Sequence, residues 1–402
     1  MIYQRLMRCG AFTAALLVGG SPAIAQTLHD FIAAAAVRNP DLAALEGRGN
    51  AIGARQRAAG SWAPAPPTIT AGYSTDQVFR DRRQRDATIG ISTPLWLPGE
   101  GTASQRVANT EKSRLSAQIA VVTLKIAGQV RDALADFAIA NAELAVAELR
   151  LRDGRSLEND TARRVKARDA SEANLLLAKA ERIAADGEVR EKRTVLAQAR
   201  IEFDNLTGMA PVMAALDDKA PIEPNDPIHP RLDDAQGALE VARANQALAE
   251  IQTRDSPEIA LIARRSRDTF GTVYNNSLGV EIKIPFSSEA RNAPRQAMAQ
   301  AEFKEAMALR MSAEREVVAE RLKARLAYDN ALVQRDLASE RAKTLTQQVA
   351  LVSRGQTGGE VTFSDFIRAR TLFYEAEAAK ARAVINVSKA RGRLNQSLGM
   401  IP

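Results

Sequence analysis

Residues 277–286, Ser-Leu-Gly-Val-Glu-Ile-Lys-Ile-Pro-Phe, alternate polar and apolar side chains until the chain reaches Pro285. Such alternation is typical of a β-strand with one apolar and one polar face. An earlier stretch, Thr88 to Pro94, alternates in the same way and also ends in proline. Proline removes a ladder hydrogen bond and bends the chain. We therefore predict that Pro94 and Pro285 mark the junctions where a strand gives way to a helix.

The two proline-ended stretches belong to a longer duplication. Pro66 and Pro257 each open a β-like run, and the distance between them equals the distance between the two strand-ending prolines. Gly208 and Gly399, each followed by methionine, keep the same offset near the ends of the two halves. This offset of about 190 residues is too long for a solenoid repeat, whose period is roughly 20–50 residues. We interpret the chain as one half-protein used twice.

The two halves are predicted as residues 26–208 and 231–402, joined by a linker at 209–230. Each half is expected to run helix, strand, strand, long helix, long helix. In the first half the elements are predicted at 29–60, 68–75, 88–94, 103 to about 152, and about 157–206. In the second half they are predicted at 231–253, 258–264, 277–285, about 291–352, and 361–398. The facing of the strand at 258–264 is ambiguous, because its residues are almost evenly apolar.

The long helices are predicted from alanine-rich stretches whose apolar positions recur every three or four residues. At about 1.5 Å per residue, a helix of about 50 residues is about 75 Å long. That length exceeds any compact core, so we expect extended coiled-coil-like hairpins.

Residues 1–25 have the organisation of a secretory signal peptide. Two arginines precede an apolar segment at 11–18 that is too short to span a bilayer, and Ala23-Ile24-Ala25 fits the cleavage pattern. Cys9 lies before the apolar segment rather than at the cleavage point, which argues against a lipid anchor. An N-terminal helix of the folded domain is the alternative.

The composition excludes several classes of protein. The chain has 402 residues, of which 46% are apolar and 4% aromatic, with one cysteine and two histidines. A disulfide scaffold is impossible, and we expect no metal site, cofactor or catalytic residues. His29 and His229 are interpreted as cap or loop residues. Charges of both signs alternate along the predicted helices, which is typical of solvated faces. We therefore predict neither an enzyme nor a nucleic-acid-binding protein.

The four predicted strands approach the roughly 9–11 residues with which a tilted strand crosses a bilayer. Four strands cannot close a barrel, for which about eight is the minimum, and open edges are not tolerated in lipid. In a membrane, several chains would therefore share one barrel, and three chains would leave room for a polar lumen. Glu281 and Lys283, on the polar face, would line that lumen. Two soluble hairpins capping a helical bundle are the alternative.

Four sets of residues follow an order found in one known family. They are the paired openings at 39–42 (Asn-Pro-Asp-Leu) and 229–232 (His-Pro-Arg-Leu), the prolines Pro94 and Pro285, the hairpin stretch 355–370 with its Thr362 and Asp365, and the closing Leu-Thr-Gly at 206–208 and Leu-Gly at 398–399. In this order the sequence resembles the TolC family of outer-membrane efflux proteins over essentially the whole mature chain. The first-half hairpin at 167–174 is weakly similar to the heavy-metal, CzcC-like branch.

The resemblance implies a mainly α fold with a small membrane β part. Duplicated long helical hairpins and four transmembrane strands per protomer would assemble as a homotrimeric α/β-barrel. It also implies an outer-membrane channel whose helices extend into the periplasm. Metal ions or small toxic compounds would pass through it passively, delivered by an inner-membrane pump and a periplasmic adaptor (membrane fusion protein). Drug, metal-ion and polypeptide export are not distinguished by the sequence. A non-transporting periplasmic coiled-coil adaptor or structural protein is the alternative.

The resemblance further implies a periplasmic aperture at Asp365 and Arg368. In the family, aspartates form rings at this position, and Arg368 stands where TolC itself has its second aspartate. A mixed Asp/Arg girdle would be close to neutral, and its charges could pair between protomers and hold the gate shut. The alternative interpretation of Asp365 is a first-turn acid stabilised by the helix dipole.

Overall fold

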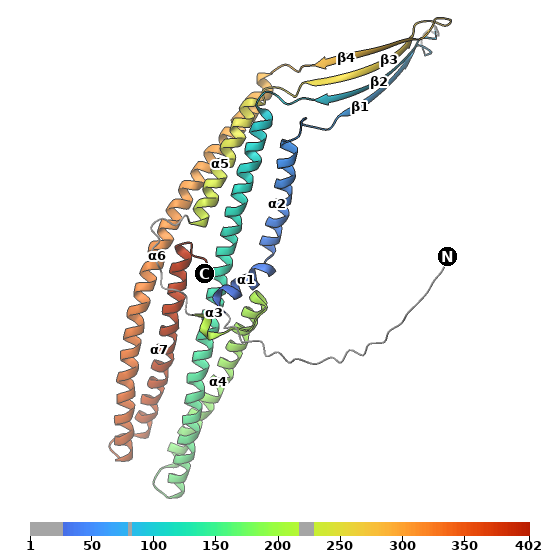
Figure 1. Ribbon diagram of the computed structural model, residues 1–402. Helices are drawn as coiled ribbons and strands as arrows, with labels where there is room; N and C mark the ends of the chain where they lie inside the picture. The colour runs from blue at the N-terminus through green and yellow to red at the C-terminus, as the bar shows by residue number, and fades with distance from the viewer. Residues whose placement is uncertain (1–26, 79–82, 217–228) are drawn as a thin grey trace, which may run out of the picture.

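A four-stranded sheet stands at one end of a long bundle of helices in the computed structural model (Figure 1). The structure describes residues 27–78, 83–216 and 229–402. The predicted signal peptide and most of the predicted linker lie outside these residues. Among the described helices, none combines the length and the apolar character that a membrane crossing requires.

The sheet contains β1 (Thr68–Thr75), β2 (Arg85–Pro94), β3 (Glu258–Arg267) and β4 (Asn275–Lys283). All neighbours are antiparallel, and the strand order β1-β2-β3-β4 sets a hairpin from each half of the chain side by side. All four strands were predicted, β1 with the same bounds and the others to within about three residues. The sheet is thus a single unit to which both halves contribute.

The register gives the sheet one apolar and one polar face. Residues directly opposite one another lie on the same face. One row of such partners crosses the whole sheet as Ile69, Ile91, Leu261 and Val280. This register also decides the facing of β3, which the sequence left ambiguous. Ile262 consequently points to the polar face, where both of its partners are glycines.

The chain before the first strand forms two helices, so the prediction of one helix at 29–60 was wrong. They are α1 (Leu28–Arg38) and α2 (Pro40–Ala59). Proline lacks an N–H and disfavours helical backbone in the residue before it, and Asn39 is accordingly extended. The Asn39 side chain caps α2 by accepting a 2.8 Å hydrogen bond from the backbone N–H of Asp41.

Two helices run the length of the bundle, α3 (Glu100–Lys166) and α6 (Glu289–Thr357). With 67 and 69 residues, each is about 100 Å long. Away from the sheet, α4 (Glu172–Thr207) returns along α3, and α7 (Phe363–Ser397) returns along α6. Nearer the sheet, α2 packs on α3, and α5 (Pro230–Ile251) packs between α3 and α6 (Figure 1). A short 3₁₀ helix, η1 (Met213–Leu216), contacts α3.

The turn between α3 and α4 lies further along the chain than predicted. A turn was expected between about 152 and 157, but α3 continues to Lys166 and Ser171 caps α4. Gly154, within the expected turn, is instead a buried helical residue. A Cβ there would lie 3.5 Å from the Cα of Arg182, an ordinary contact distance, so α3 and α4 run close together at this level.

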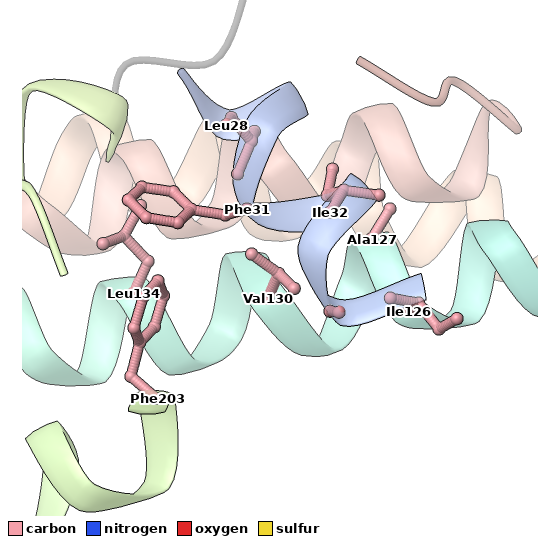
Figure 2. Packing of buried hydrophobic residues seen from close by; sticks show 9 residues of the cluster. Leu28, Phe31, Ile32, Ile126, Ala127, Val130, Leu134 and Phe203 are labelled. Carbon is pink, nitrogen blue, oxygen red and sulfur yellow. The ribbon is translucent and has the colours of Figure 1, made fainter. Parts of the chain in front are cut away.

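The largest core cluster fastens α1 to the middle of the bundle. Phe31 of α1 and Phe203 of α4 are fully buried and meet edge to face, with ring centroids 5.0 Å apart. Figure 2 shows the α1 side chains over one face of α3, where Ile126, Val130 and Leu134 lie, and Phe203 approaching from α4. Burying each ring stabilises the fold by about 1.5–3 kcal/mol. The middle of the helical bundle is therefore its best-packed part.

The start of α5 is packed tightly against the end of the second half. Gly399 has a positive φ of 77°, and a Cβ on it would lie 2.8 Å from Cδ of Pro230. His229 is 4% exposed and caps α5, because its Nδ1 accepts a 3.2 Å hydrogen bond from the backbone N–H of Arg231. This confirms the cap interpretation for His229, whereas His29 lies within the first turn of α1.

We expect the stability of the fold to depend on pH through the titration of His229, because its neutral imidazole caps α5. Burial, and then the nearby Arg231, lower the pKa of His229, while Glu320 and a backbone hydrogen bond to Gln396 raise it, leaving a net downward shift. The folded state favours the neutral imidazole, so this contribution is full above pH 6.5, the ordinary pKa, and is lost as the pH falls below it. Losing the cap should cost about 1 kcal/mol.

The measurement is the melting temperature of the wild type and of His229→Asn at about pH 7 and about pH 5. Asparagine keeps a cap acceptor and does not titrate, so the variant should lose less stability on acidification. Equal losses in the two proteins would contradict the prediction.

Candidate aperture at the helical tips

The turn between α6 and α7 forms the free tip of the second hairpin. Gly359 takes a positive φ of 80°, and Thr362 then caps α7. The Thr362 hydroxyl accepts a 3.2 Å hydrogen bond from the backbone N–H of Asp365 and donates a 2.7 Å bond to its carboxylate. Asp365 is therefore held as a first-turn acid, where the helix dipole favours negative charge.

Asp365 and Arg368 are both exposed and lie three residues apart on one side of α7. No ion pair joins them, and Arg368 pairs with no carboxylate of the described residues. The structure therefore brings the two predicted aperture residues to one surface without mutual contact. Both side chains remain accessible at the tip.

An apolar cluster joins the tips of the two helical hairpins. Phe363 and Phe366 are buried against Ala178 of α4, with Leu157 of α3 and Val352 of α6 packed around them. The two rings lie with centroids 6.2 Å apart. The tip is therefore anchored on one side and free on the other.

Behind this cluster, a buried polar group links α7 to α3. The Tyr374 hydroxyl donates a short hydrogen bond to Asp153 and accepts a 3.0 Å bond from Nη2 of Arg370. The same guanidinium lies 4.0 Å from the Asp153 carboxylate and 5.5 Å from the centroid of Phe366. Burial and the hydrogen bond to Asp153 raise the pKa of Tyr374 to about 12. The phenol therefore remains a hydrogen-bond donor at any physiological pH.

This group was missed in the sequence analysis. Arg370 and Tyr374 are separated by one helical turn, which indicates only that they share a face. Asp153 lies 221 residues before Tyr374. No local sequence pattern predicts a contact between residues so far apart in the chain, because the contact depends on how α7 packs on α3.

A cavity of about 480 Å³ lies beside the buried tyrosine, between α3, α6 and α7. Polar side chains form much of its wall, including Asp160, Thr161 and Arg164 of α3 and Gln356 of α6. At this level the two hairpins are therefore joined by the hydrogen bonds of Tyr374, and the space beside these bonds is not filled by any side chain that the structure describes.

Partly buried ion pairs join α3 to α4. Arg150 of α3 donates to Glu181 at 2.7 Å and to Glu188 at 2.8 Å, with its side chain only 17% exposed. Lys192 of α4 reaches Glu143 at 2.7 Å, and that carboxylate also binds Arg382 of α7 at 3.1 Å. Partly buried pairs in a network contribute more than isolated surface pairs. The first hairpin is consequently fastened along much of its length.

The remaining predicted site residues lie at the sheet. Glu281 and Lys283 are exposed and lie on its polar face, opposite Ala260 and Glu258 respectively. Pro94 is the last residue of β2, and Pro285 lies between β4 and α6. Among the described residues, no three His, Cys, Asp or Glu side chains gather as a metal site would require.

Comparison with known proteins gives one family match and several solved structures of the same fold. Residues 229–400 match the family described as Outer membrane efflux protein. No curated protein matches the sequence. Among the solved structures that match, the following three each cover 92% of this chain. VceC from Vibrio cholerae is 16% identical with a TM-score of 0.72, and 96% of it is covered. CusC is 15% identical with a TM-score of 0.76, and 92% of it is covered. MtrE from Neisseria gonorrhoeae is 18% identical with a TM-score of 0.71, and 88% of it is covered.

The structural likenesses extend over both halves, whereas the family match lies in the second half. At these identities the solved structures show the fold. The family is one of efflux channels, which are transporters and not enzymes. The second half of the chain therefore matches the outer membrane efflux protein family, and the described residues share the fold of these solved structures.

Proposed function

We propose that this protein is the outer-membrane duct of a tripartite efflux system. It would act as a homotrimer whose barrel lies in the outer membrane and whose helices extend into the periplasm. A periplasmic adaptor and an inner-membrane pump would deliver the substrate, which then passes through the duct without chemical change. Metal ions or small toxic compounds are the proposed substrates, and a wide polar passage requires no tight binding site for them.

The observation that carries this proposal is the exposed apolar face of the sheet. Ile69 is 73% exposed, Leu278 72%, Val280 67% and Ile282 62%. Together with their row partners they form a continuous apolar surface that no described helix covers. Soluble monomers rarely expose such patches, and lipid would bury this one.

The edges of the same sheet support the trimer. β1 and β4 each have one neighbour, so both leave a row of backbone donors and acceptors unpaired. Lipid does not tolerate such edges, and four strands are too few to close. Three chains would pair β4 of each with β1 of the next. The resulting barrel of twelve strands is wide enough for a polar lumen lined by Glu281 and Lys283.

The alternative, a periplasmic coiled-coil adaptor or structural protein, fits the helices but not the sheet. Such a protein would expose its apolar sheet face to water. The duct also gives the long helices a role, because α3 and α6 would continue the barrel for about 100 Å as a tunnel.

The same proposal includes the division of the chain. Residues 1–25 would direct export, and 26–208 and 231–402 would be the two repeats, joined at 209–230. Equivalent helix caps support it. Ser171 and Thr362 are the N-caps of α4 and α7, and each accepts a hydrogen bond from the backbone N–H three residues later.

We place the gate at the tip of the second hairpin. Asp365 and Arg368 would face the axis and pair with neighbouring protomers when the aperture is closed. The Tyr374–Asp153–Arg370 group would hold α7 against α3 in that state. The adjoining cavity leaves the tip of the second hairpin space to shift, whereas the ion pairs of Lys389 and Arg393 with α3 lie further from the tip.

The assembly is tested by the mass of the detergent-extracted protein. Native mass spectrometry should give three times the mass of the mature chain, and the protein should fractionate with outer membranes. A monomer recovered from the periplasm without detergent would overturn the proposal.

The role of the Tyr374–Asp153–Arg370 group in holding the aperture closed is tested by Tyr374→Phe, which removes only the hydroxyl. Losing a buried hydrogen bond to a charged group should cost about 1.5–3 kcal/mol, so the closed aperture should open more often. Planar-bilayer recordings measure the open fraction. Tyr328→Phe, at a half-buried position of α6 away from the tip, is the control and should leave it unchanged. Equal behaviour of the two variants would show that Tyr374 does not hold the gate.

The aperture is tested by Arg368→Asp. Replacing the cation by an anion should raise conductance to cations and weaken closure, because the charge that would pair with a neighbouring carboxylate is reversed. The control is Arg341→Asp, an exposed site on α6 away from the tip. Unchanged conductance and cation selectivity in Arg368→Asp would indicate that this side chain faces away from the axis.

A further inference from the structure

Three arginines lie together at the end of the sheet that is farthest from the helices (Figure 1). Arg85 of β2 is directly opposite Arg267 of β3, and Arg265 is opposite Ala87. Since side chains alternate along a strand, these arginines share the face that carries Ile89 and Ala263. The apolar face therefore ends, at its outer rim, in three guanidinium groups.

The positive charges of these three arginines are not balanced by neighbouring carboxylates within the described ranges. Like charges directly opposite one another destabilise a pair of strands. None of the three arginines forms an ion pair with a carboxylate of the described residues, and Nε of Arg267 is buried without a hydrogen-bond partner. Arg264, next to Arg265 but on the polar face, is instead paired with Asp86. The polar face is neutralised where the apolar face is not.

An aromatic ring orders two of the guanidinium groups. Tyr274 lies 4.4 Å from Arg265 and 5.0 Å from Arg267, measured from each guanidinium carbon to the ring centroid. Cation–π contacts of this kind hold the groups in place without using their N–H donors. One donor of Arg267, its Nη2, is directed to the backbone carbonyl of Arg83 at 3.4 Å. The three arginines are thus partly ordered before any ligand arrives.

Along the strands, the order from apolar rows to arginines matches the order from acyl chains to headgroups in one leaflet of a lipid membrane. Apolar rows, suited to acyl chains, are followed by N–H donors at the level where headgroup phosphates lie. Guanidinium forks bind phosphate oxygens in pairs, and two opposed forks complement a doubly charged anion. Since β2 and β3 are the inner strands, one chain supplies the complete set.

We propose that Arg85, Arg265 and Arg267 bind the phosphate groups of an anionic lipid in the outer leaflet, whose acyl chains lie over Ile89 and the apolar rows beneath it. The inference rests on the proposed function, since it requires this face to lie in a membrane. The bound phosphate would also relieve the repulsion between the opposed arginines.

The test measures lipid binding to the purified, detergent-solubilised protein by native mass spectrometry. The probe is bisphosphorylated lipid A, compared with the same lipid after removal of its phosphates and with inorganic phosphate. The wild type should bind the phosphorylated lipid most tightly. Inorganic phosphate at equal concentration should not displace it, because acyl contacts contribute to binding.

Arg265→Gln and Arg264→Gln form a matched pair, adjacent on one strand but on opposite faces. Arg265→Gln should weaken binding of the phosphorylated lipid by about tenfold or more, as expected for one lost charge-assisted contact. Arg264→Gln should change it by less than about twofold. Arg85→Gln is the second variant if Arg265→Gln does not fold.

The proposal is overturned if both members of the pair lose affinity equally, if the dephosphorylated lipid binds as well, or if inorganic phosphate alone competes fully. Failure of the underlying function has a different signature. In that case the wild-type protein would not insert into vesicles at all, whereas failure of the lipid site would leave insertion and trimer mass intact.

Discussion

The backbone hydrogen bonds that β1 and β4 cannot make within one chain govern the architecture. A sheet of four strands with two open edges and one exposed apolar face is not a finished structure in water or in lipid. Under the proposed function, both deficits would end where copies of the chain join edge to edge in a membrane. The long helices then follow from the sheet, because α3 and α6 each continue from a strand that the barrel would hold in position.

Within the helical part, the tips of the two hairpins differ from the contacts further along. Within the first hairpin, Arg150 and Lys192 pair with carboxylates of the facing helix, in partly buried pairs. In the second, Lys389 and Arg393 of α7 pair with carboxylates of α3. Its tip rests instead on aromatic packing at Phe363 and Phe366 and on the buried Tyr374 hydroxyl, beside a cavity. Under the proposed function, this tip is the part that would move.

The strands were predicted more accurately than the helices, for a physical reason. Alternation with a period of two is a local property, and Pro94 and Pro285 end it sharply. Helix ends in an alanine-rich chain carry no comparable signal. A turn was therefore predicted between about 152 and 157, where α3 in fact continues and buries Gly154. The break at Asn39 was visible in the sequence as Asn-Pro, yet it was included within one helix. Asp365 and Arg368 were assigned from the resemblance, and their role at the aperture stays a prediction.

The sequence by itself determined the repeated order of elements and the two faces of most strands. These properties depend on neighbouring residues or on composition. Only the tertiary structure decided that β3 turns Ile262 to the polar face, that Tyr374 meets Asp153, and that Arg85 stands opposite Arg267. Each of these contacts joins segments more than 150 residues apart or depends on strand register. A one-residue slip in register would move every side chain of a strand to the other face, and the evenly apolar start of β3 carries no alternation that specifies the choice.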